Sequence, residues 1–455
     1  MKPAQIHPAP TRLPRRAVGR LTRWHVLTVS LLFLGYGGYY FCRSDYSVAL
    51  PLILAEQVRK GTPANVAQIR MGTIASLGVL VYAIGKFPSG GLADRFGGRR
   101  NFLGGMFGSI LFTILFMLGG GFPVFTFAWL GNRLVQSLGW VGLVKVTSRW
   151  FSYTTYGSVM AVLSLSYLFG DAISRAIMSL LLAHGFGWRG VFGAGAVLLS
   201  AILLCNLIFL RDSPQSYHLP LPEENPLNLF SHESAAAQRP GMAAIFRTLL
   251  SSYAFWLVCG LSLGTTLLRE TFNLWIPTYF TQMVGMTSAQ AASGSALFPF
   301  FGGLSVLFAG FLSDHLGPEG RSRILFGGLC FSVPALLGLA EVTMHAPRFV
   351  PLALVAAVAF CLLGPYSYLA GAMALDFGGR EGSATASGMI DGFGYLAGIL
   401  SGNAMAHLAV AYGWQTMFLV LAGVAGLTSV VGGLALWQQH RRAIAIGLLR
   451  PVEGQ

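Results

Sequence analysis

Twelve long apolar stretches set the limits on how this chain can fold. Each is close to or longer than the roughly 20 residues that an α-helix needs to cross a bilayer. We place them at residues 25–54, 68–92, 101–121, 124–150, 157–183, 187–210, 252–282, 287–313, 323–343, 349–376, 384–410 and 413–437. Charged residues make up 10% of the chain, whereas soluble domains carry about a quarter. The sequence therefore predicts an all-α membrane protein with twelve transmembrane helices.

The positive charges are distributed unevenly between the two sides of the membrane. With the N-terminus inside, 19 of the 30 Lys and Arg residues fall in cytoplasmic segments, five in external segments and six inside spans. This asymmetry is the positive-inside rule. The net charge of +14 therefore reports orientation and not nucleic-acid binding. We expect an integral protein of a bacterial inner membrane with both termini in the cytoplasm.

A segment rich in Pro, Ser and charge divides the spans into two sets of six. Such a composition is typical of a linker. The predicted organisation is a cytoplasmic tail at 1–24, a six-helix bundle at 25–210, a cytoplasmic linker at 211–251, a second six-helix bundle at 252–437 and a cytoplasmic tail at 438–455.

The two halves also repeat each other. The loop "GLADRFGGRR" (91–100) returns as "GFLSDHLGPEGRSR" (310–323), and Arg43 and Arg269 are each followed by a proline eight residues later. Parallel repeats of this kind place a site between the halves near the bilayer midplane. We therefore expect the two arginines to face each other across that site.

Charged side chains inside the spans need compensation, because each costs about 2.5–3.5 kcal/mol at a helix centre on insertion scales. The cations are Arg43, Lys86, Arg133, Lys145, Arg175 and Arg269. The acids are fewer, namely Asp45, Asp171, Glu270 and Asp391. An excess of cations predicts that an anion supplies the missing charge.

Spacing along a helix decides which of these charges can pair locally. Asp171 and Arg175 are spaced i,i+4 and can pair with each other. Residues one or two apart do not face each other on a helix, so Arg43 is a poor partner for Asp45 and Arg269 for its neighbour Glu270. A cross-helix pair of Arg269 with Asp391 stays open. Two arginines from opposite halves favour phosphate or carboxylate, which a guanidinium binds with two hydrogen bonds.

The twelve spans, the repeat and the G-x-L-x-D-R-x-G-x-R loop resemble the major facilitator superfamily, which implies two pseudo-symmetric six-helix bundles. In that loop the charged side chains can cap helix ends and pair across the bundle in one state. The gating candidates there are Asp94, Arg95, Arg99 and Asp314. Arg133, in "RLVQSLG", resembles a fourth-span arginine of the superfamily with a structural or gating role.

Within the superfamily the chain resembles the organophosphate:phosphate antiporters. The likeness is sharpest in "RDSPQSYHLPLPEE" (211–224), "QSLGWVGLVKVTSRWFS" (136–152), "LLRETFNLWIPTYF" (267–280) and "ASGMIDGFGYLAG" (386–398). The resemblance implies that spans one, two, four and seven line a central cavity. It implies the substrate-binding residues Arg43, Arg269, Lys86, Lys145, Tyr36, Tyr40, Tyr82, Tyr167 and Tyr395. Tyr167 stands in place of a histidine and Leu363 in place of a tyrosine of the glycerol-3-phosphate carrier.

The function expected from these residues is transport, not enzymatic catalysis. We expect a monomeric antiporter, without cofactor or metal, that exchanges a phosphorylated organic anion for inorganic phosphate by alternating access, with Arg43 and Arg269 clamping the anion. One rival is a proton-coupled symporter of a carboxylate or phosphonate, in which the intramembrane acids Glu270, Asp391 and Asp171 could titrate. Asp45, Glu270 and Asp391 are further coupling or gating candidates. The other rival is a transporter-like receptor for a sugar phosphate.

Overall fold

The computed structural model describes residues 15–217, 247, 249–316, 319–343, 346–373, 386 and 388–445, and all regular structure within them is helical. The helices are α1 Arg15–Gly38, η1 Tyr39–Cys42, α2 Asp45–Arg59, α3 Ala64–Phe96, α4 Gly98–Leu118, α5 Phe122–Trp150, α6 Tyr153–Ala183, α7 Trp188–Phe209, η2 Pro214–Tyr217, α9 Tyr253–Gln282, α10 Ser288–Ser295, α11 Leu297–His315, α12 Gly320–Ala340, α13 Phe349–Tyr368, η5 Leu369–Met373, η6 Ile399–Ser401 and α15 Asn403–Ala445.

These helices form the twelve predicted spans, so the predicted fold class is confirmed. The first span is broken into α1, η1 and α2, the eighth into α10 and α11, and α15 holds the last span beyond a kink at Gly413, whose φ is +84°. Only nine stretches of the described chain are long and apolar enough to be recognised by hydropathy. That count joins the last two spans into one, and it omits α5 and α9, which carry cavity-lining charges.

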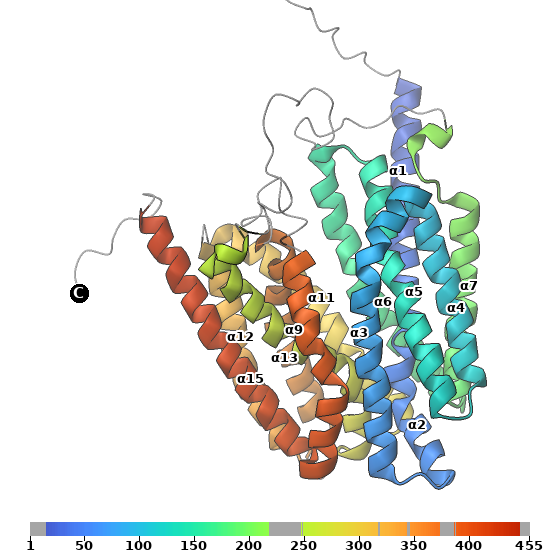
Figure 1. Ribbon diagram of the computed structural model, residues 1–455, viewed down its shortest axis with the longest axis vertical. Helices are drawn as coiled ribbons and strands as arrows, with labels where there is room; N and C mark the ends of the chain where they lie inside the picture. Colours follow the sequence, from blue (N-terminus) through green and yellow to red (C-terminus); the bar gives the residue numbers. More distant parts are fainter. Residues whose placement is uncertain are drawn as a thin grey trace, which may run out of the picture.

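The spans form two six-helix bundles that stand side by side, the first running from blue to green and the second from yellow to red (Figure 1). Within the first, α4 packs against α5 and α7, and within the second, α12 packs against α13 and α15. Close backbone approach allows this packing: a Cβ added to Gly142 of α5 would lie 2.6 Å from the backbone nitrogen of Phe102 in α4. Small residues at such contacts are the usual means of packing helices in a membrane.

We call the end where α1 begins and α15 ends the terminal end, and the opposite end the far end (Figure 1). The bundles diverge toward the terminal end and converge toward the far end (Figure 1). Toward the far end, hydrogen bonds join α3 to the start of α15, which belongs to the eleventh span: Asn403 donates from its side-chain nitrogen to Thr73 Oγ1 (2.7 Å) and from its backbone nitrogen to Ser76 Oγ (2.8 Å). Glycines Gly72 and Gly402 meet in the same contact. This contact, the α3–402 seam, holds the two bundles together at the far end.

At the terminal end of the first bundle, the motif loop caps a helix as expected. The Arg99 guanidinium donates to the carbonyl oxygens of Leu210 (2.6 Å) and Leu207 (2.7 Å), so it caps the end of α7. Asp212 accepts from the Arg99 backbone nitrogen (2.9 Å) and pairs with Arg149. The side chains of Asp94, Arg95 and Asp314 lie outside the described residues, and their gating role stays a prediction.

At the terminal end of the second bundle, Glu319 links two helices. Its carboxylate accepts hydrogen bonds from His440 of α15 (2.6 Å) and Arg323 of α12 (2.6 Å). Burial alone would raise the pKa of Glu319, but the bonds from His440 and Arg323 outweigh it and lower that pKa below its usual value.

The residue boundaries of the predicted bundles stay a prediction. The tails at 1–24 and 438–455 and the linker at 211–251 fall partly on residues that the structure does not describe.

Candidate functional site

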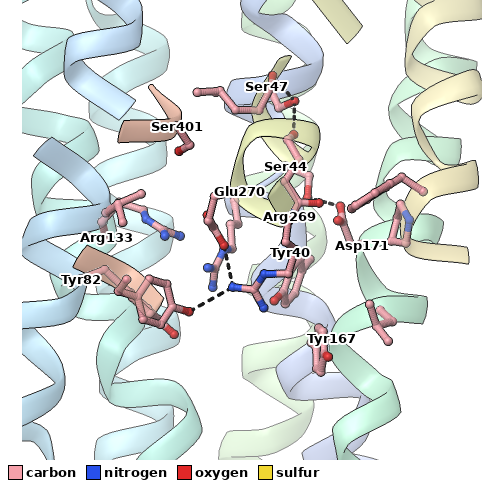
Figure 2. Close-up of a pocket in the computed structure, with 18 of the residues that line it drawn as sticks. Tyr40, Ser44, Ser47, Tyr82, Arg133, Tyr167, Asp171, Arg269, Glu270 and Ser401 are labelled. Carbon is pink, nitrogen blue, oxygen red and sulfur yellow. Dashed lines mark hydrogen bonds and ion pairs between the residues drawn. The ribbon is translucent and has the colours of Figure 1, made fainter. Parts of the chain in front are cut away.

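A polar cavity of about 350 Å³ lies between the two bundles. Its walls come from both halves: α1, η1, α2, α3, α5 and α6 from the first, and α9, α11, α13 and the segments at 388–398 and η6 from the second. Figure 2 shows side chains from both halves pointing into this space, among them Arg133, Arg269 and Tyr82.

The ionisable lysine, arginine and acidic side chains that line the cavity do not balance. The cations are Arg43, Lys86, Arg133, Arg175 and Arg269, and the acids are Asp171, Glu270 and Asp391. With all of them ionised, the lining carries a net charge of +2. A bound anion with two negative charges would neutralise it.

Arg269 lies on α9 with its guanidinium turned toward the cavity. It pairs with its neighbour Glu270 at 2.6 Å (Figure 2). It also lies 3.4 Å from the Tyr395 hydroxyl. The expectation that neighbours would not pair was wrong, because the long arginine side chain bends back along the helix surface to reach the carboxylate. Its Nε–H is buried and has no hydrogen-bond partner. The guanidinium therefore keeps a donor for a further acceptor.

Arg43 lies at the break in the first span. The chain leaves the 3₁₀ turn η1 and resumes as an α-helix at Asp45, and Arg43 between them has φ −127° and ψ −45°. Its guanidinium lies 5.2 Å from the centre of the Tyr40 ring and 5.0 Å from that of Tyr82. Among the described residues, no carboxylate lies within ion-pair distance of it. The break thus presents an arginine to the cavity with aromatic faces as its neighbours.

Lys86 and Asp391 form an ion pair across the two bundles, with the Lys86 Nζ 3.3 Å from the carboxylate. This is the cross-helix partner that Asp391 takes, in place of Arg269. Both side chains stay about 30% exposed, at 28% and 32%. A pair this accessible can open when an anion enters, because exposed pairs are worth only about 0–1 kcal/mol.

Asp171 and Arg175 pair on α6 at 2.7 Å, which confirms the i,i+4 prediction. Ser44 donates to the same carboxylate at 2.5 Å (Figure 2). Arg175 also donates to Ser295 Oγ (3.1 Å) and to the Asn273 carbonyl (3.0 Å) in the second half. The pair therefore joins the bundles, and it lines the cavity as well.

All five tyrosines predicted for the site line the cavity: Tyr36, Tyr40, Tyr82, Tyr167 and Tyr395. Two further tyrosines line it that were not predicted: Tyr46 of α2, and Tyr366 of α13, whose ring centre lies 4.6 Å from the Arg269 guanidinium. Leu363, which the resemblance set against a tyrosine of the glycerol-3-phosphate carrier, lies one helical turn before Tyr366. A tyrosine one turn away was the available signal.

Lys145 does not line the cavity in this structure, contrary to expectation. It lies 12 residues along α5 from Arg133, about 18 Å at the rise of an α-helix. There α5 packs on the start of α4, and a Cβ added to Gly98 would lie 2.8 Å from the Lys145 Cβ. Arg133 lines the cavity instead, with its guanidinium 4.6 Å from the centre of the Tyr82 ring.

The remaining acid of the first span, Asp45, is fully buried behind the cavity and does not line it. Among the described residues, no cluster of three or more His, Cys, Asp or Glu side chains could hold a metal ion. The chemistry that this arrangement supports is the binding of an anion by cations, tyrosine hydroxyls and aromatic faces.

Comparison with known proteins agrees with this arrangement. Residues 32–402 match the family described as Major Facilitator Superfamily. A probable hexose phosphate transport protein of Chlamydia muridarum is 26% identical over 438 residues, which cover 92% of each chain. The membrane sensor protein UhpC of Escherichia coli is 27% identical over 427 residues, covering 90% of this chain and 92% of the sensor. A solved bacterial homologue of the human lysosomal transporter Spinster shares the fold, with a TM-score of 0.69 at 14% identity over 92% of this chain and 98% of that one.

Proposed function

The chain belongs to the major facilitator superfamily, and we propose that it exchanges a small phosphorylated organic anion for inorganic phosphate. In this proposal Arg43 and Arg269 clamp the phosphoryl group between the two bundles, and Lys86 and the cavity tyrosines complete its surroundings. The similarity to a probable hexose phosphate transport protein supports a sugar phosphate as the organic substrate.

The observation that carries the proposal is the charge of the cavity. Its lining has a net charge of +2, and a phosphate monoester carries about −1.5 to −2 near neutral pH. Arg43 has no acidic partner among the described residues, and Arg269 keeps a buried Nε–H without an acceptor. Phosphate oxygens are good acceptors for both guanidinium groups. A neutral substrate would leave these charges uncompensated.

Obligatory exchange follows from the same charges. To expose the site at the far end, the α3–402 seam must open and the bundles must close over the cavity from the terminal side. Closing draws Arg43 and Arg269 toward each other, which is unfavourable in a low-dielectric site unless an anion lies between them. The loaded carrier therefore changes conformation more readily than the empty one. With both termini in the cytoplasm of a bacterium, the present conformation is the one open to the inside.

Transport assays in liposomes test the proposal directly. Purified protein is reconstituted in liposomes loaded with phosphate, and uptake of labelled phosphate is followed without a pH gradient. We expect saturable exchange that a panel of sugar phosphates inhibits. Arg43→Lys and Arg269→Lys keep the charge but lose the two-pronged guanidinium, and each should abolish exchange while the protein still inserts. Arg348→Lys, a change on the far surface, is the matched control. Substantial exchange by both cavity variants would refute the clamp.

A sensor is the second candidate, because the UhpC relative is a membrane sensor protein. A sensor would bind sugar phosphate without exchanging it, so binding measured by calorimetry together with no uptake would favour this function. A proton-coupled symporter that uses Glu270 or Asp391 has less support. Both carboxylates are engaged in ion pairs in this conformation. Uptake that requires an inward proton gradient would support it nevertheless.

A further inference from the structure

A second polar cluster lies inside the first bundle, behind the cavity wall. Hydrogen bonds join Gln136 of α5 to Cys42 of η1 and Asn132 of α5 to Thr113 of α4, and Cys42 lies close to both Thr113 and Asp45 of α2. Asp45 is 0% exposed, Asn132 2% and Gln136 3%. Of these residues, none lines the anion cavity. The proposed transport mechanism gives this cluster no role.

The cluster has more acceptors than donors. Oδ2 of Asp45, Oδ1 of Asn132 and Oε1 of Gln136 are all buried without a hydrogen-bond partner. Their other polar atoms are used: Asp45 Oδ1 accepts from the Tyr46 backbone nitrogen (2.7 Å), and the Asn132 side-chain nitrogen donates to Thr113 Oγ1 (3.0 Å). A buried polar atom left unpaired costs about 1–3 kcal/mol, and three in one cluster point to a missing positive or donating group.

The break in the first span explains why the cluster forms. Between η1 and α2 the helical hydrogen bonds are interrupted, and the Cys42 carbonyl accepts instead from the Gln136 side-chain nitrogen (2.8 Å). The Cys42 thiol contacts Thr113 and lies close enough to Asp45 to interact with its charge. In membrane transporters, broken helices commonly supply the sites for coupling ions. The same break turns Arg43 toward the cavity and Asp45 away from it.

No fixed cation of the described chain compensates Asp45. Of the charged groups on the elements packed against it, Arg43 and Arg133 lie against the Tyr82 ring and face the cavity. Four others are paired elsewhere: Lys86 of α3 with Asp391, Asp171 with Arg175 within α6, Arg269 with Glu270 within α9, and Arg189 of α7 with Glu56 at the far end. Arg70 of α3 lies against the Phe122 ring, and Lys60, just past the end of α2, pairs with Glu56. Besides Arg43, the titratable groups closest to Asp45 in sequence are Cys42 and Tyr46, and the Tyr46 hydroxyl donates to the Met71 carbonyl. An ionised Asp45 would thus be an unpaired charge in the bundle core, which is very costly.

We propose that Asp45 is a proton-binding site of the first bundle, distinct from the anion site. In the present conformation it is the neutral carboxylic acid, and its O–H donates to a side-chain amide oxygen of the cluster, on Asn132 or Gln136. A proton supplies both the missing donor and the missing charge. A buried water would supply only donors, and a hydrated cation has no open route to a fully enclosed carboxylate.

Protonation of Asp45 is then linked to the conformation of the carrier. Wherever the first bundle rearranges so that water or a cation reaches Asp45, the acid can lose its proton, so high pH favours that other conformation. One linked proton can shift such an equilibrium by up to about tenfold per pH unit. We therefore expect the rate of phosphate exchange, with equal pH on both sides, to fall at least about threefold between about pH 6 and about pH 8.

Infrared spectroscopy of the reconstituted full-length protein tests the protonation itself, independently of transport. Wild type should show the C=O stretch of a buried carboxylic acid at neutral pH. Asp45→Asn should remove this band, whereas Glu341→Gln, the same acid-to-amide change at the far end of α12, should keep it. If Asp45→Asn does not insert, Asp45→Glu should retain an acid but shift its band. Absence of the band from wild type, or a band unchanged in the Asp45 variant, would overturn the proposal.

The transport assay then asks whether the proton matters for function. Asp45→Asn mimics the neutral acid, so it should still exchange phosphate, and its rate should change less than that of wild type between about pH 6 and about pH 8, because only the ionisation of phosphate itself remains. An Asp45→Asn protein that keeps the wild-type pH profile would refute the linkage. Loss of exchange in the Arg43 and Arg269 variants would be unaffected by either result, so the failure of this inference and the failure of the proposed function can be told apart.

Discussion

Substitution of Gly402 by Ala should shift the carrier away from the present conformation. In the α3–402 seam, a Cβ at position 402 would lie 2.2 Å from the Gly72 carbonyl oxygen and 2.6 Å from Ser76 Oγ. Ordinary contacts of a Cβ begin at about 3.4 Å. The backbone of α3 must therefore retreat by about 1 Å, because a carbonyl oxygen cannot rotate out of the way as a side chain can. The φ of Gly402 is −87°, so alanine adds no backbone strain of its own.

The size of the effect follows from the cost of overpacking, about 1–3 kcal/mol. This cost falls only on the conformation in which the seam is closed. The equilibrium should thus move toward the conformation open at the far end by about 5- to 150-fold. Gly423→Ala in α15 is the matched control, since a Cβ there meets nothing within 4 Å.

Spin labels across the far end measure this shift. Asn65 and Gln415 are exposed there, one in each half, and cysteines at these positions can be labelled after the five native cysteines are replaced. Double electron–electron resonance should show a longer distance, or a new longer population, in Gly402→Ala but not in Gly423→Ala. An unchanged distance distribution in Gly402→Ala would show that the seam is not what closes the far end.

Three further predictions follow from the ion pairs. Lys86→Met leaves Asp391 unpaired and lowers the net charge of the cavity from +2 to +1, so phosphate exchange should weaken. The double variant Lys86→Met with Asp391→Asn restores the net charge of +2 and should exchange phosphate faster than Lys86→Met alone. A double variant no faster than the single one would argue against charge balance. Asp212→Asn weakens the contacts at the start of α4 and with α5, and should lower the stability by about 1 kcal/mol, measured as a lower melting temperature in detergent, with transport otherwise intact. Because the pKa of Glu319 is lowered in the folded protein, the stability that its carboxylate contributes is present above the unfolded-state pKa and is lost as the pH falls through the folded-state pKa. Between about pH 5 and about pH 3, the melting temperature of wild type should therefore fall more than that of Glu319→Gln. Equal decreases would contradict the role of the bond between Glu319 and His440.

The sequence was sufficient for the spans because crossing a bilayer is a local requirement. About 20 apolar residues must follow one another, and every backbone group must bond within the helix, so length and hydropathy alone locate the helices. The stretches at 124–150 and 252–282, which became α5 and α9, were placed in the same way, although the charged side chains they carry lower their hydropathy. The i,i+4 pair of Asp171 and Arg175 was predictable for the same reason, since helix geometry fixes it.

The partners of the other charges depended on how the helices rotate and meet. No local rule relates Lys86 to Asp391, which are 305 residues apart and come from different bundles. The prediction that Glu270 is a poor partner for Arg269 failed because it used the positions of helical residues and ignored the reach of a long side chain. Lys145 was misplaced because the sequence gives the spacing along α5 but not the depth of the cavity on it.

The sequence by itself therefore determined which segments cross the membrane and that cations are in excess within them. The tertiary structure decided which of those cations share one cavity, and that Asp45 lies behind its wall without a partner. The physical reason is that hydropathy acts on each segment separately, whereas a cavity and an ion pair exist only after helices distant in sequence have packed together.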